Sequence, residues 1–223
     1  RNIDGIIYNT YRTDDEMADY LRHISERIPI VYMNKTLGDD ENYVCVYTDG
    51  FKSSRKAVQY LIDKGKHKLG YVMNSEDVSI IEDRFEGFVQ GLKDYGLELN
   101  KKWVYRVQRE NEPDYIKLGR DAAKYYASLK ERPDGILTAT DMLAIGCVKG
   151  FNESRIKVPD EISVIGFDNI FVSALIDPPL TTIAQPVRKM GQAAAEILIS
   201  TLQGKKTQNK VVFEGKLIVR ETT

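Results

Sequence analysis

Short apolar runs alternate along this chain with stretches in which apolar residues recur every three or four positions. Such runs are typical of buried strands, and the longer spacing is typical of helices that pack on one face. The runs predict strands at 3–8, 30–33, 43–47, 69–73, 103–107, 135–140, 162–167, 211–213 and 217–219. The spacing predicts helices near 17–28, 50–62, 85–95, 118–129, 142–151 and 187–204. This alternation indicates βαβ units and parallel sheets.

The length of 223 residues allows one large domain or two lobes, each with its own core. The chain contains no internal repeat, low-complexity tract or Gly/Ser-rich linker. Two lobes without such a linker would be joined by several crossings of the chain. The sequence opens abruptly on Arg1-Asn2-Ile3-Asp4, at the edge of a strand and without a signal-peptide pattern, so we expect a preceding N-terminal segment.

Composition excludes several classes of protein. Hydrophobic residues make up 42% and charged residues 29%, which indicates a globular chain rather than a disordered one. A formal net charge of −1 argues against this segment gripping nucleic-acid phosphates by itself. No apolar run approaches the roughly 20 residues that span a bilayer. The two cysteines, Cys45 and Cys147, lie in apolar runs, so we expect buried thiols and a reducing compartment.

The sequence contains few residues in arrangements typical of enzymes. His23 and His67 have no cysteine or aspartate at metal-ligand spacing. The chain has no G-x-S-x-G elbow, no Walker-type glycine loop and no dinucleotide fingerprint after a strand. We therefore predict neither a metal site nor a cofactor, and no enzymatic activity.

Polar residues at strand ends are the candidates for a binding site. Asp168 follows the buried run 163–167, and ligands of open α/β sheets bind at the carboxyl ends of the strands. A carboxylate there can accept hydrogen bonds from two ligand hydroxyls. The alternative is that Asp168 only caps a helix or turn.

Arg84 stands at the start of a predicted helix, after the strand at 69–73. Its guanidinium can clamp hydroxyls or a carboxylate, although a surface ion pair is the alternative. We expect Arg84 and Asp168 to face each other across a ligand cleft. Thr140 and Asp141 end another strand, where helix capping is the alternative. The remaining candidates for lining the cleft are Asn34, Tyr47, Tyr115 and Gln185. Their donors and acceptors suit a sugar or sugar derivative, with a purine or an amino acid as alternatives.

A series of motifs, in this order and spacing, resembles the lactose/galactose-repressor family of bacterial transcription regulators over nearly the whole chain. The most specific piece is V-P-D-E-I-S-V-I-G-F-D at 158–168, followed by L-T-T-I at 180–183. The other pieces are D-G-I-I at 4–7, I-P-I-V at 28–31, D-G at 49–50, the segment 65–70, R-x-x-G at 84–87, P-D-G-I at 133–136, T-D-x-x-A-x-G at 140–146 and V-R-E-T at 219–222.

The resemblance implies a two-lobed fold of the type I periplasmic-binding-protein kind, in which each lobe is a parallel sheet flanked by helices. It implies an N-lobe formed by 1–46 plus 185–213 and a C-lobe formed by 47–184 plus 214–223. Similar proteins carry an N-terminal helix-turn-helix DNA-binding domain and then a first strand and helix of the N-lobe. None of these is found here, so we expect the N-lobe to be incomplete.

In that family, the residues that match Arg84 and Asp168 touch the effector, and those that match Asn34, Thr140 and Gln185 often line the cleft. This sequence departs from the pattern at Asn34, where an aspartate is common. It departs again at Asn169, which replaces a second acidic residue, and at an inserted Lys66. These departures leave the identity of the ligand open.

The resulting expectation is the effector-binding, dimerising core of a cytoplasmic repressor or activator. A small molecule, with a sugar as the expected class, would bind between the lobes and change the affinity of the DNA-binding domain for an operator. A periplasmic sugar-binding protein is the alternative, and an enzyme is a third class. The apolar run 171–176 either fills the C-lobe core or contributes to a homodimer interface through Phe171, Ala174, Leu175 and Ile176.

Overall fold

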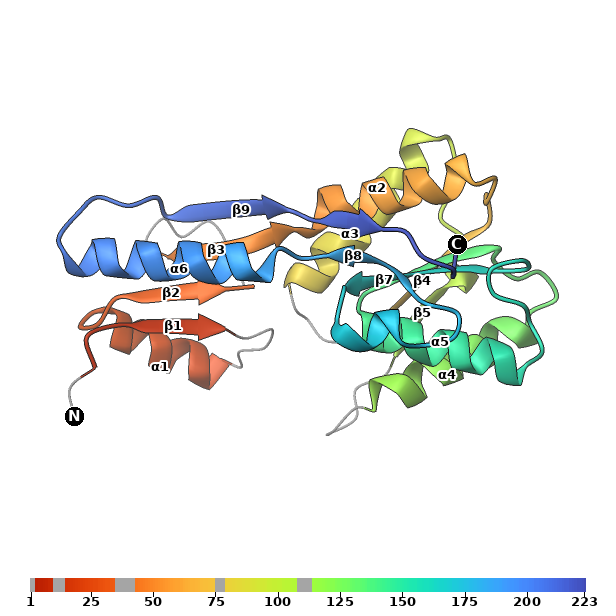
Figure 1. The fold of residues 1–223 in the computed structure, drawn as a ribbon, viewed down its shortest axis with the longest axis horizontal. Coiled ribbons are helices and arrows are strands. Elements are labelled where there is room, and N and C mark those ends of the chain that lie inside the picture. The colour runs from red at the N-terminus through yellow and green to blue at the C-terminus, as the bar shows by residue number, and fades with distance from the viewer. Residues whose placement is uncertain (1–2, 10–14, 35–42, 75–78, 108–113) are drawn as a thin grey trace. The chain divides into compact units, whose positions relative to one another are not determined.

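The computed structural model describes residues 3–9, 15–34, 43–74, 79–107 and 114–223 (Figure 1). The chain divides into two units. Unit 1 comprises Arg1–Asp49, Val78–Ile80 and Pro186–Glu214, and unit 2 comprises Gly50–Asp77, Ile81–Gln185 and Gly215–Thr223. Apart from the short segment Val78–Ile80, which is assigned to unit 1, the chain therefore crosses between the units at Asp49–Gly50, at Gln185–Pro186 and at Glu214–Gly215.

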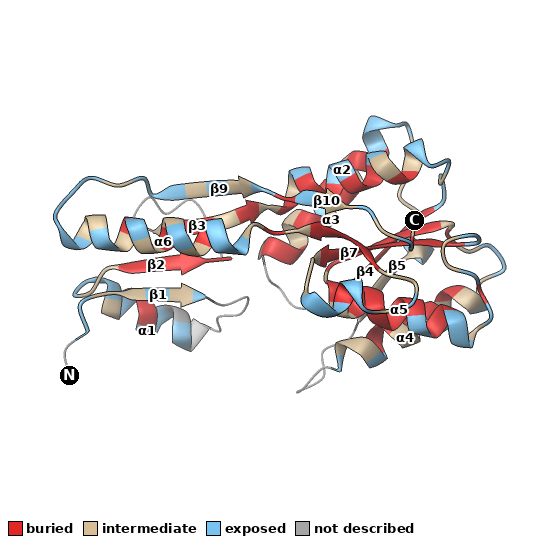
Figure 2. Cartoon of the chain, in the orientation of Figure 1, coloured by how far each residue is buried: buried red, intermediate tan, exposed pale blue. Residues whose placement is uncertain are grey.

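Unit 1 is built on a parallel sheet with the strand order β1-β2-β3-β9. Its strands are β1 (Ile6–Asn9), β2 (Ile30–Met33), β3 (Val44–Asp49) and β9 (Lys210–Glu214), and its helices are α1 (Asp15–Ser25) and α6 (Val187–Leu202). All four residues of β2 are buried (Figure 2). Successive side chains of a strand point to opposite faces, so a strand covered on both sides reads as a continuous apolar run.

The two faces of this sheet have separate cores. Ile30 and Tyr32 pack with Leu21 of α1, whereas Val31 and Met33 pack with residues of α6. The α6 residues in this second core are Met190, Ala194 and Ile197. The alternation along β2 thus explains why the sheet is covered by one helix on each face.

Unit 2 contains a six-stranded sheet with the order β10-β8-β7-β6-β4-β5. The strands are β4 (Leu69–Asn74), β5 (Val104–Val107), β6 (Gly135–Thr138), β7 (Ser163–Asp168), β8 (Thr181–Ala184) and β10 (Lys216–Ile218). The helices are α2 (Gly50–Asp63), α3 (Ser79–Asp94), α4 (Tyr115–Ser128) and α5 (Asp141–Glu153), with 3-10 turns η1 (Lys101–Trp103) and η2 (Phe171–Ala174). All strand pairs are parallel except β10 with β8.

The strand order places a switch point between β4 and β6. From β4 the chain moves outward to β5, and it then returns to the other side of β4 to form β6, β7 and β8. The helices that follow β4 and β6 therefore diverge at the carboxyl ends of these strands, where ligands bind in open α/β sheets. Helices α3 and α5 begin at this edge.

Helices α4 and α5 pack with their backbones unusually close together. A Cβ atom added at Gly119 would lie 2.1 Å from the carbonyl oxygen of Leu143, and one added at Gly146 would lie 2.2 Å from that of Ile116. These glycines are needed because no side chain fits between the two helices at these points.

The fold class predicted from the sequence, a two-part α/β fold with helix-flanked sheets, is confirmed. Three local features differ from prediction. β8 was not expected as a strand, β10 is antiparallel, and α3 starts at Ser79, which puts Arg84 in its second turn. Cys45 and Cys147 are buried free thiols, as expected.

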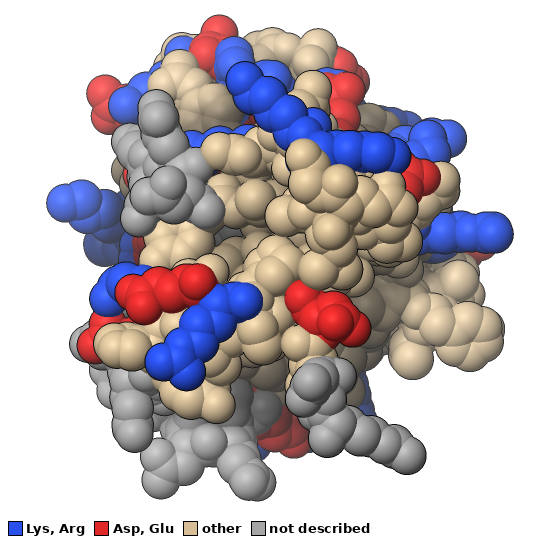
Figure 3. Space-filling view, turned by 90° about the vertical axis from the view of Figure 1, so that its left-hand side faces the viewer, with Lys and Arg blue, Asp and Glu red and all other residues tan. Residues whose placement is uncertain are grey.

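The surface carries both signs of charge. On the face drawn in Figure 3, basic and acidic side chains are scattered among uncharged ones. This mixture agrees with the formal net charge of −1. Within the part of the chain that the structure describes, none of the helices has both the length and the apolar character needed to cross a bilayer.

Candidate functional site

Asp168 ends β7, whose preceding five residues are all buried. The backbone turns sharply at this point, because Asp168 has φ of 119° and Asn169 has φ of 55°. Positive φ values are uncommon for residues with a side chain, and they often occur at functional sites. The turn leaves the Asp168 side chain 21% exposed at the carboxyl edge of the sheet.

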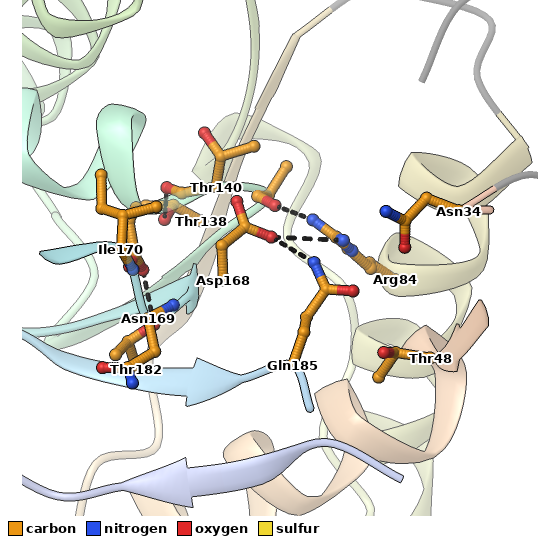
Figure 4. A network of polar contacts seen from close by, with 12 residues as sticks. Asn34, Thr48, Arg84, Thr138, Thr140, Asp168, Asn169, Ile170, Thr182 and Gln185 are labelled. Atoms are coloured by element: carbon orange, nitrogen blue, oxygen red, sulfur yellow. Dashed lines mark hydrogen bonds and ion pairs between the residues drawn. The ribbon is translucent and has the colours of Figure 1, made fainter. Parts of the chain in front are cut away.

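Arg84 is the largest fully buried side chain, at 2% exposure. Its guanidinium stacks on Phe167, with 3.7 Å between Cζ and the ring centroid. Nη1 donates a hydrogen bond of 2.6 Å to the carbonyl oxygen of Ala139, and Nη2 lies 3.5 Å from Oδ1 of Asp168. Gln185 also donates from Nε2 to that same oxygen, at 2.7 Å (Figure 4). Four separate segments of unit 2 thus supply one polar cluster.

The expectation that Arg84 and Asp168 face each other across a cleft is wrong in one respect. The two side chains are in direct contact within unit 2. Arg84 lies in the second turn of α3, and its long side chain extends from the helix toward the carboxylate of Asp168 (Figure 4). A buried guanidinium needs an opposite charge, and Asp168 supplies it.

The cluster retains unused hydrogen-bonding capacity. Within the described residues, Oδ2 of Asp168 and Oε1 of Gln185 accept no hydrogen bond, and the buried Nε of Arg84 has no acceptor. Buried polar groups are normally satisfied, and exceptions suggest a water molecule or a ligand. The arrangement can therefore receive a polar molecule that both donates and accepts.

Burial raises the pKa of Asp168 to about 6, and the nearby carboxylate of Asp141 acts in the same direction. The guanidinium of Arg84 and the hydrogen bond from Gln185 oppose this rise. At neutral pH the carboxyl group is thus mainly ionised, but it gains a proton more readily than an exposed aspartate.

We expect this raised pKa to make stability depend on pH. Because the folded state holds the Asp168 proton more tightly than the unfolded state, the unfolding free energy should fall as pH rises from about 4 to about 6 and then level off. The loss is at most about 3 kcal/mol, since a shift of one unit corresponds to about 1.4 kcal/mol. Urea unfolding of the wild type and of Asp168→Asn between pH 4 and 8 measures it. An identical pH dependence in the two proteins would contradict the assignment.

Thr140 and Asp141 occupy the start of α5. Thr140 is the N-cap, and its Oγ1 accepts a hydrogen bond of 3.4 Å from the amide of Leu143. Asp141 is fully buried, and its carboxylate accepts hydrogen bonds from Thr182, Ser173 and the amide of Ile170. Thr140 thus lies beside the cluster, whereas the carboxylate of Asp141 is occupied by the protein itself.

That Asn34, Tyr47 and Tyr115 line the same site stays a prediction. Asn34, at φ of 56°, is buried in unit 1, and its Nδ2 donates to Oδ1 of Asn9 at 3.1 Å. Tyr47 lies within β3 of the same unit, and Tyr115 is the first residue of α4.

Several residues of the site were missed at the sequence level. Phe167 supports Arg84, and Arg220 donates from Nη2 to Oδ1 of Asn169 at 2.7 Å and from Nη1 to the carbonyl oxygen of Leu180 at 2.6 Å. The sequence signals were the family motifs at 158–168 and 219–222, which contain Phe167 and Arg220 but gave neither residue a role. Among the described residues, no three histidine, cysteine, aspartate or glutamate side chains are grouped as a metal site would require.

Comparison with known proteins places this geometry in a family. Residues 58–223 match the model of the periplasmic binding protein-like domain. The repressor PurR of Photobacterium profundum is 29% identical over the whole chain, which spans 65% of PurR. The regulator NtdR of the NTD biosynthesis operon of Bacillus subtilis is 30% identical, again over the whole chain, which spans 66% of NtdR. The chain thus covers slightly less than two thirds of these relatives.

A solved structure of the transcriptional regulator CelR in complex with cellobiose superposes with a TM-score of 0.88 at 25% identity. It aligns with 99% of this chain, which covers 66% of CelR. The relatives are regulators rather than enzymes, in agreement with the absence of catalytic motifs from the sequence. The chain belongs to the periplasmic binding protein-like domain family and is related to the regulators of the lactose/galactose-repressor family, as its motifs indicated.

Proposed function

We propose that this chain is the effector-binding and dimerising core of a bacterial, cytoplasmic transcription regulator. A small molecule, most simply a sugar or sugar derivative, binds at Asp168, Arg84 and Gln185. Binding changes the affinity for operator DNA, which a domain outside this chain recognises. The names of the relatives support regulation, and the polar cluster supports a small-molecule ligand.

The observation that carries the ligand proposal is the incompletely satisfied cluster at the switch point of unit 2. Asp168 offers a free carboxylate oxygen, and Gln185 offers a free amide oxygen within the described residues. Arg84, at 2% exposure, pairs with this carboxylate. Preorganised charged acceptors of this kind bind hydroxyl groups strongly.

A sugar fits these groups better than a planar base does. Each sugar hydroxyl both donates and accepts, so neighbouring hydroxyls can engage the two free oxygens together. The complex of the structural relative CelR with cellobiose supports the same chemical class.

A thermal-shift screen against monosaccharides, disaccharides, purines and amino acids tests the proposal, since a ligand that binds the native state raises its apparent stability. Asp168→Ala should then weaken binding of the stabilising sugar by roughly 10- to 150-fold, or about 1.5–3 kcal/mol. Asp160→Ala, at an exposed aspartate, is the matched control and should leave the affinity unchanged. Tight binding of a nucleobase with no response to any sugar would overturn the sugar assignment.

The proposed dimer rests on the surface run that follows the site. Phe171 is 82% exposed and Leu175 is 65% exposed, and Val172 and Ala174 are also exposed. The run therefore does not fill the core of unit 2, which was the alternative at the sequence level. Contiguous exposed apolar side chains often mark an interaction site, and two-fold homodimers are the commonest assembly.

We expect Leu175→Asp to weaken self-association by at least about tenfold, because it places a charge in a desolvated interface. Analytical ultracentrifugation over a range of protein concentrations measures the change. Tyr95→Asp, which alters an exposed aromatic residue just after α3, should associate like the wild type. A wild type that is monomeric at tens of micromolar would contradict the dimer.

The regulatory part of the proposal requires the DNA-binding domain. In the complete polypeptide, a saturating sugar should change the affinity for operator DNA, and DNA should change the affinity for the sugar by the same factor. Equal operator affinity with and without a bound sugar would exclude effector control.

A further inference from the structure

Asp141 has a buried carboxylate that takes no part in the proposed ligand binding. It is fully buried at the start of α5. Oδ1 accepts a hydrogen bond of 2.5 Å from Oγ1 of Thr182, and Oδ2 accepts one of 2.5 Å from Oγ of Ser173 and one of 2.9 Å from the amide of Ile170. Burial raises the pKa of this carboxyl group, and these hydrogen bonds counteract the rise. No ligand could replace these donors without dismantling the loop.

Two neighbouring residues, Gly166 and Thr182, accommodate the Asp141 carboxylate. A Cβ atom added at Gly166 would lie 2.2 Å from Oδ1 of Asp141. Gly166 therefore lets the carboxylate lie against β7, two residues before Asp168. Thr182, which donates to the same oxygen, is paired with Gly166 in the adjacent strand β8.

The donors to Asp141 belong to two functional features. Ile170 follows the turn at Asp168 and Asn169, where both residues have positive φ. This turn orients the Asp168 carboxylate that is proposed to bind the ligand. Ser173 is the buried residue of η2, and its exposed neighbours Val172 and Ala174 belong to the apolar run. One side chain thus bonds to the turn that orients Asp168 and to the centre of the exposed run.

We propose that Asp141 is a positioning residue that holds the turn at Asp168 and Asn169 and the apolar run 171–176 as one unit. A change at the Asp168 carboxylate is thereby transmitted to the run. Its biological use rests on the proposed function, because the unit would connect effector binding to self-association. A ligand that moved Asp168 would then also shift the geometry of the dimer surface.

The proton serves as the test ligand, because burial raises the pKa of Asp168 to about 6 and no effector has to be known. The groups that face this carboxyl are Arg84 from α3, Asp141 from α5 and the neutral Gln185 after β8. Protonation removes the charge that pairs with Arg84 and thereby alters the contacts that hold the turn.

NMR of the 13C,15N-labelled chain from pH 4.5 to 8 follows the Asp168 carboxyl carbon and the amides of Ser173 and Leu175. In the wild type all three signals should share one midpoint, and Asp168→Asn should abolish that transition at both amides. In Asp141→Asn the Asp168 midpoint should fall by about half a unit or more, because a neighbouring negative charge is gone. In this variant, the amide signals of Ser173 and Leu175 should no longer change as Asp168 gains its proton.

Ser173→Ala provides a second, milder variant. It should keep the Asp168 midpoint within about 0.3 units of the wild type, because the hydrogen bond to Ile170 remains. It should also remove the transition at Leu175. The proposal is overturned if the amides of Ser173 and Leu175 still follow the Asp168 titration in Asp141→Asn. A second result also overturns it and can be obtained even if Asp141→Asn does not fold: in Ser173→Ala, the amide signal of Leu175 still changes with the protonation of Asp168. Neither result depends on which ligand binds, so a failed sugar screen leaves this test intact.

Discussion

Replacing Arg84 by methionine is expected to reduce the unfolding free energy at pH 7 by about 3–5 kcal/mol, the range for removing one partner of a buried ion pair. The guanidinium is 2% exposed, and the carboxylate of Asp168 would remain without its cation. The variant also loses the hydrogen bond to Ala139 and the contact with the Phe167 ring. Urea denaturation followed by circular dichroism measures the change.

A double-mutant cycle separates the charge effect from packing. Arg84→Met combined with Asp168→Asn leaves no unpaired charge, so it should be more stable at pH 7 than Arg84→Met alone. Arg106→Met is the matched control. Arg106 pairs with the carboxylate of Glu82 at 3.1 Å and lies over the ring of Phe85, as Arg84 does with Asp168 and Phe167, but its side chain is half-exposed. Its effect should stay within about 1 kcal/mol. A loss in Arg84→Met as small as in this control would show that the pair is not buried in solution.

The second large effect is expected at the contact between α4 and α5. Gly146→Ala should destabilise unit 2 by about 1–3 kcal/mol, and Gly146→Val by more, because the added atoms meet backbone that cannot rotate away. The loss occurs even though alanine favours a helix by about 1 kcal/mol over glycine.

Gly191→Ala tests the same substitution without the steric conflict. Gly191 lies inside α6, and a Cβ atom there would meet nothing within 4 Å. This variant should therefore be stabilised by about 0.5–1 kcal/mol. Thermal unfolding of both variants measures the contrast, and two shifts of the same sign would refute the close packing of α4 and α5.

The sequence predicted most elements because their signals are local. The run 30–33 is apolar throughout since both faces of β2 are covered, and the helical stripes mark the faces that lie on the sheets. β8 was missed because Thr181 and Thr182 are polar residues that are fully buried in the strand between β7 and the edge strand β10. There the Thr222 hydroxyl accepts a hydrogen bond from the amide of Thr181, a contact between residues distant in the sequence. No local pattern reveals such a partner.

The candidate site shows the same limit. Asp168 and Arg84 were chosen as candidates because periodicity placed Asp168 at the end of a strand and Arg84 near the start of a helix. Their direct contact could not be predicted, since it depends on how far α3 extends toward its N-terminus. Asp141 was predicted as a ligand contact because it follows a strand, and its three donors come from residues 170, 173 and 182, far along the chain. Only the folded chain shows that these donors already use it.

The crossings of the chain between the units at Asp49–Gly50, Gln185–Pro186 and Glu214–Gly215 have a consequence for dissection by proteases. Each unit is assembled from segments far apart in the sequence, so one cut at any crossing leaves the two units covalently joined through the other two. A nicked chain would migrate as fragments only after denaturation. Expressing unit 2 alone from a single gene would require a direct join between Gln185 and Gly215, which replaces the excursion through α6 and β9.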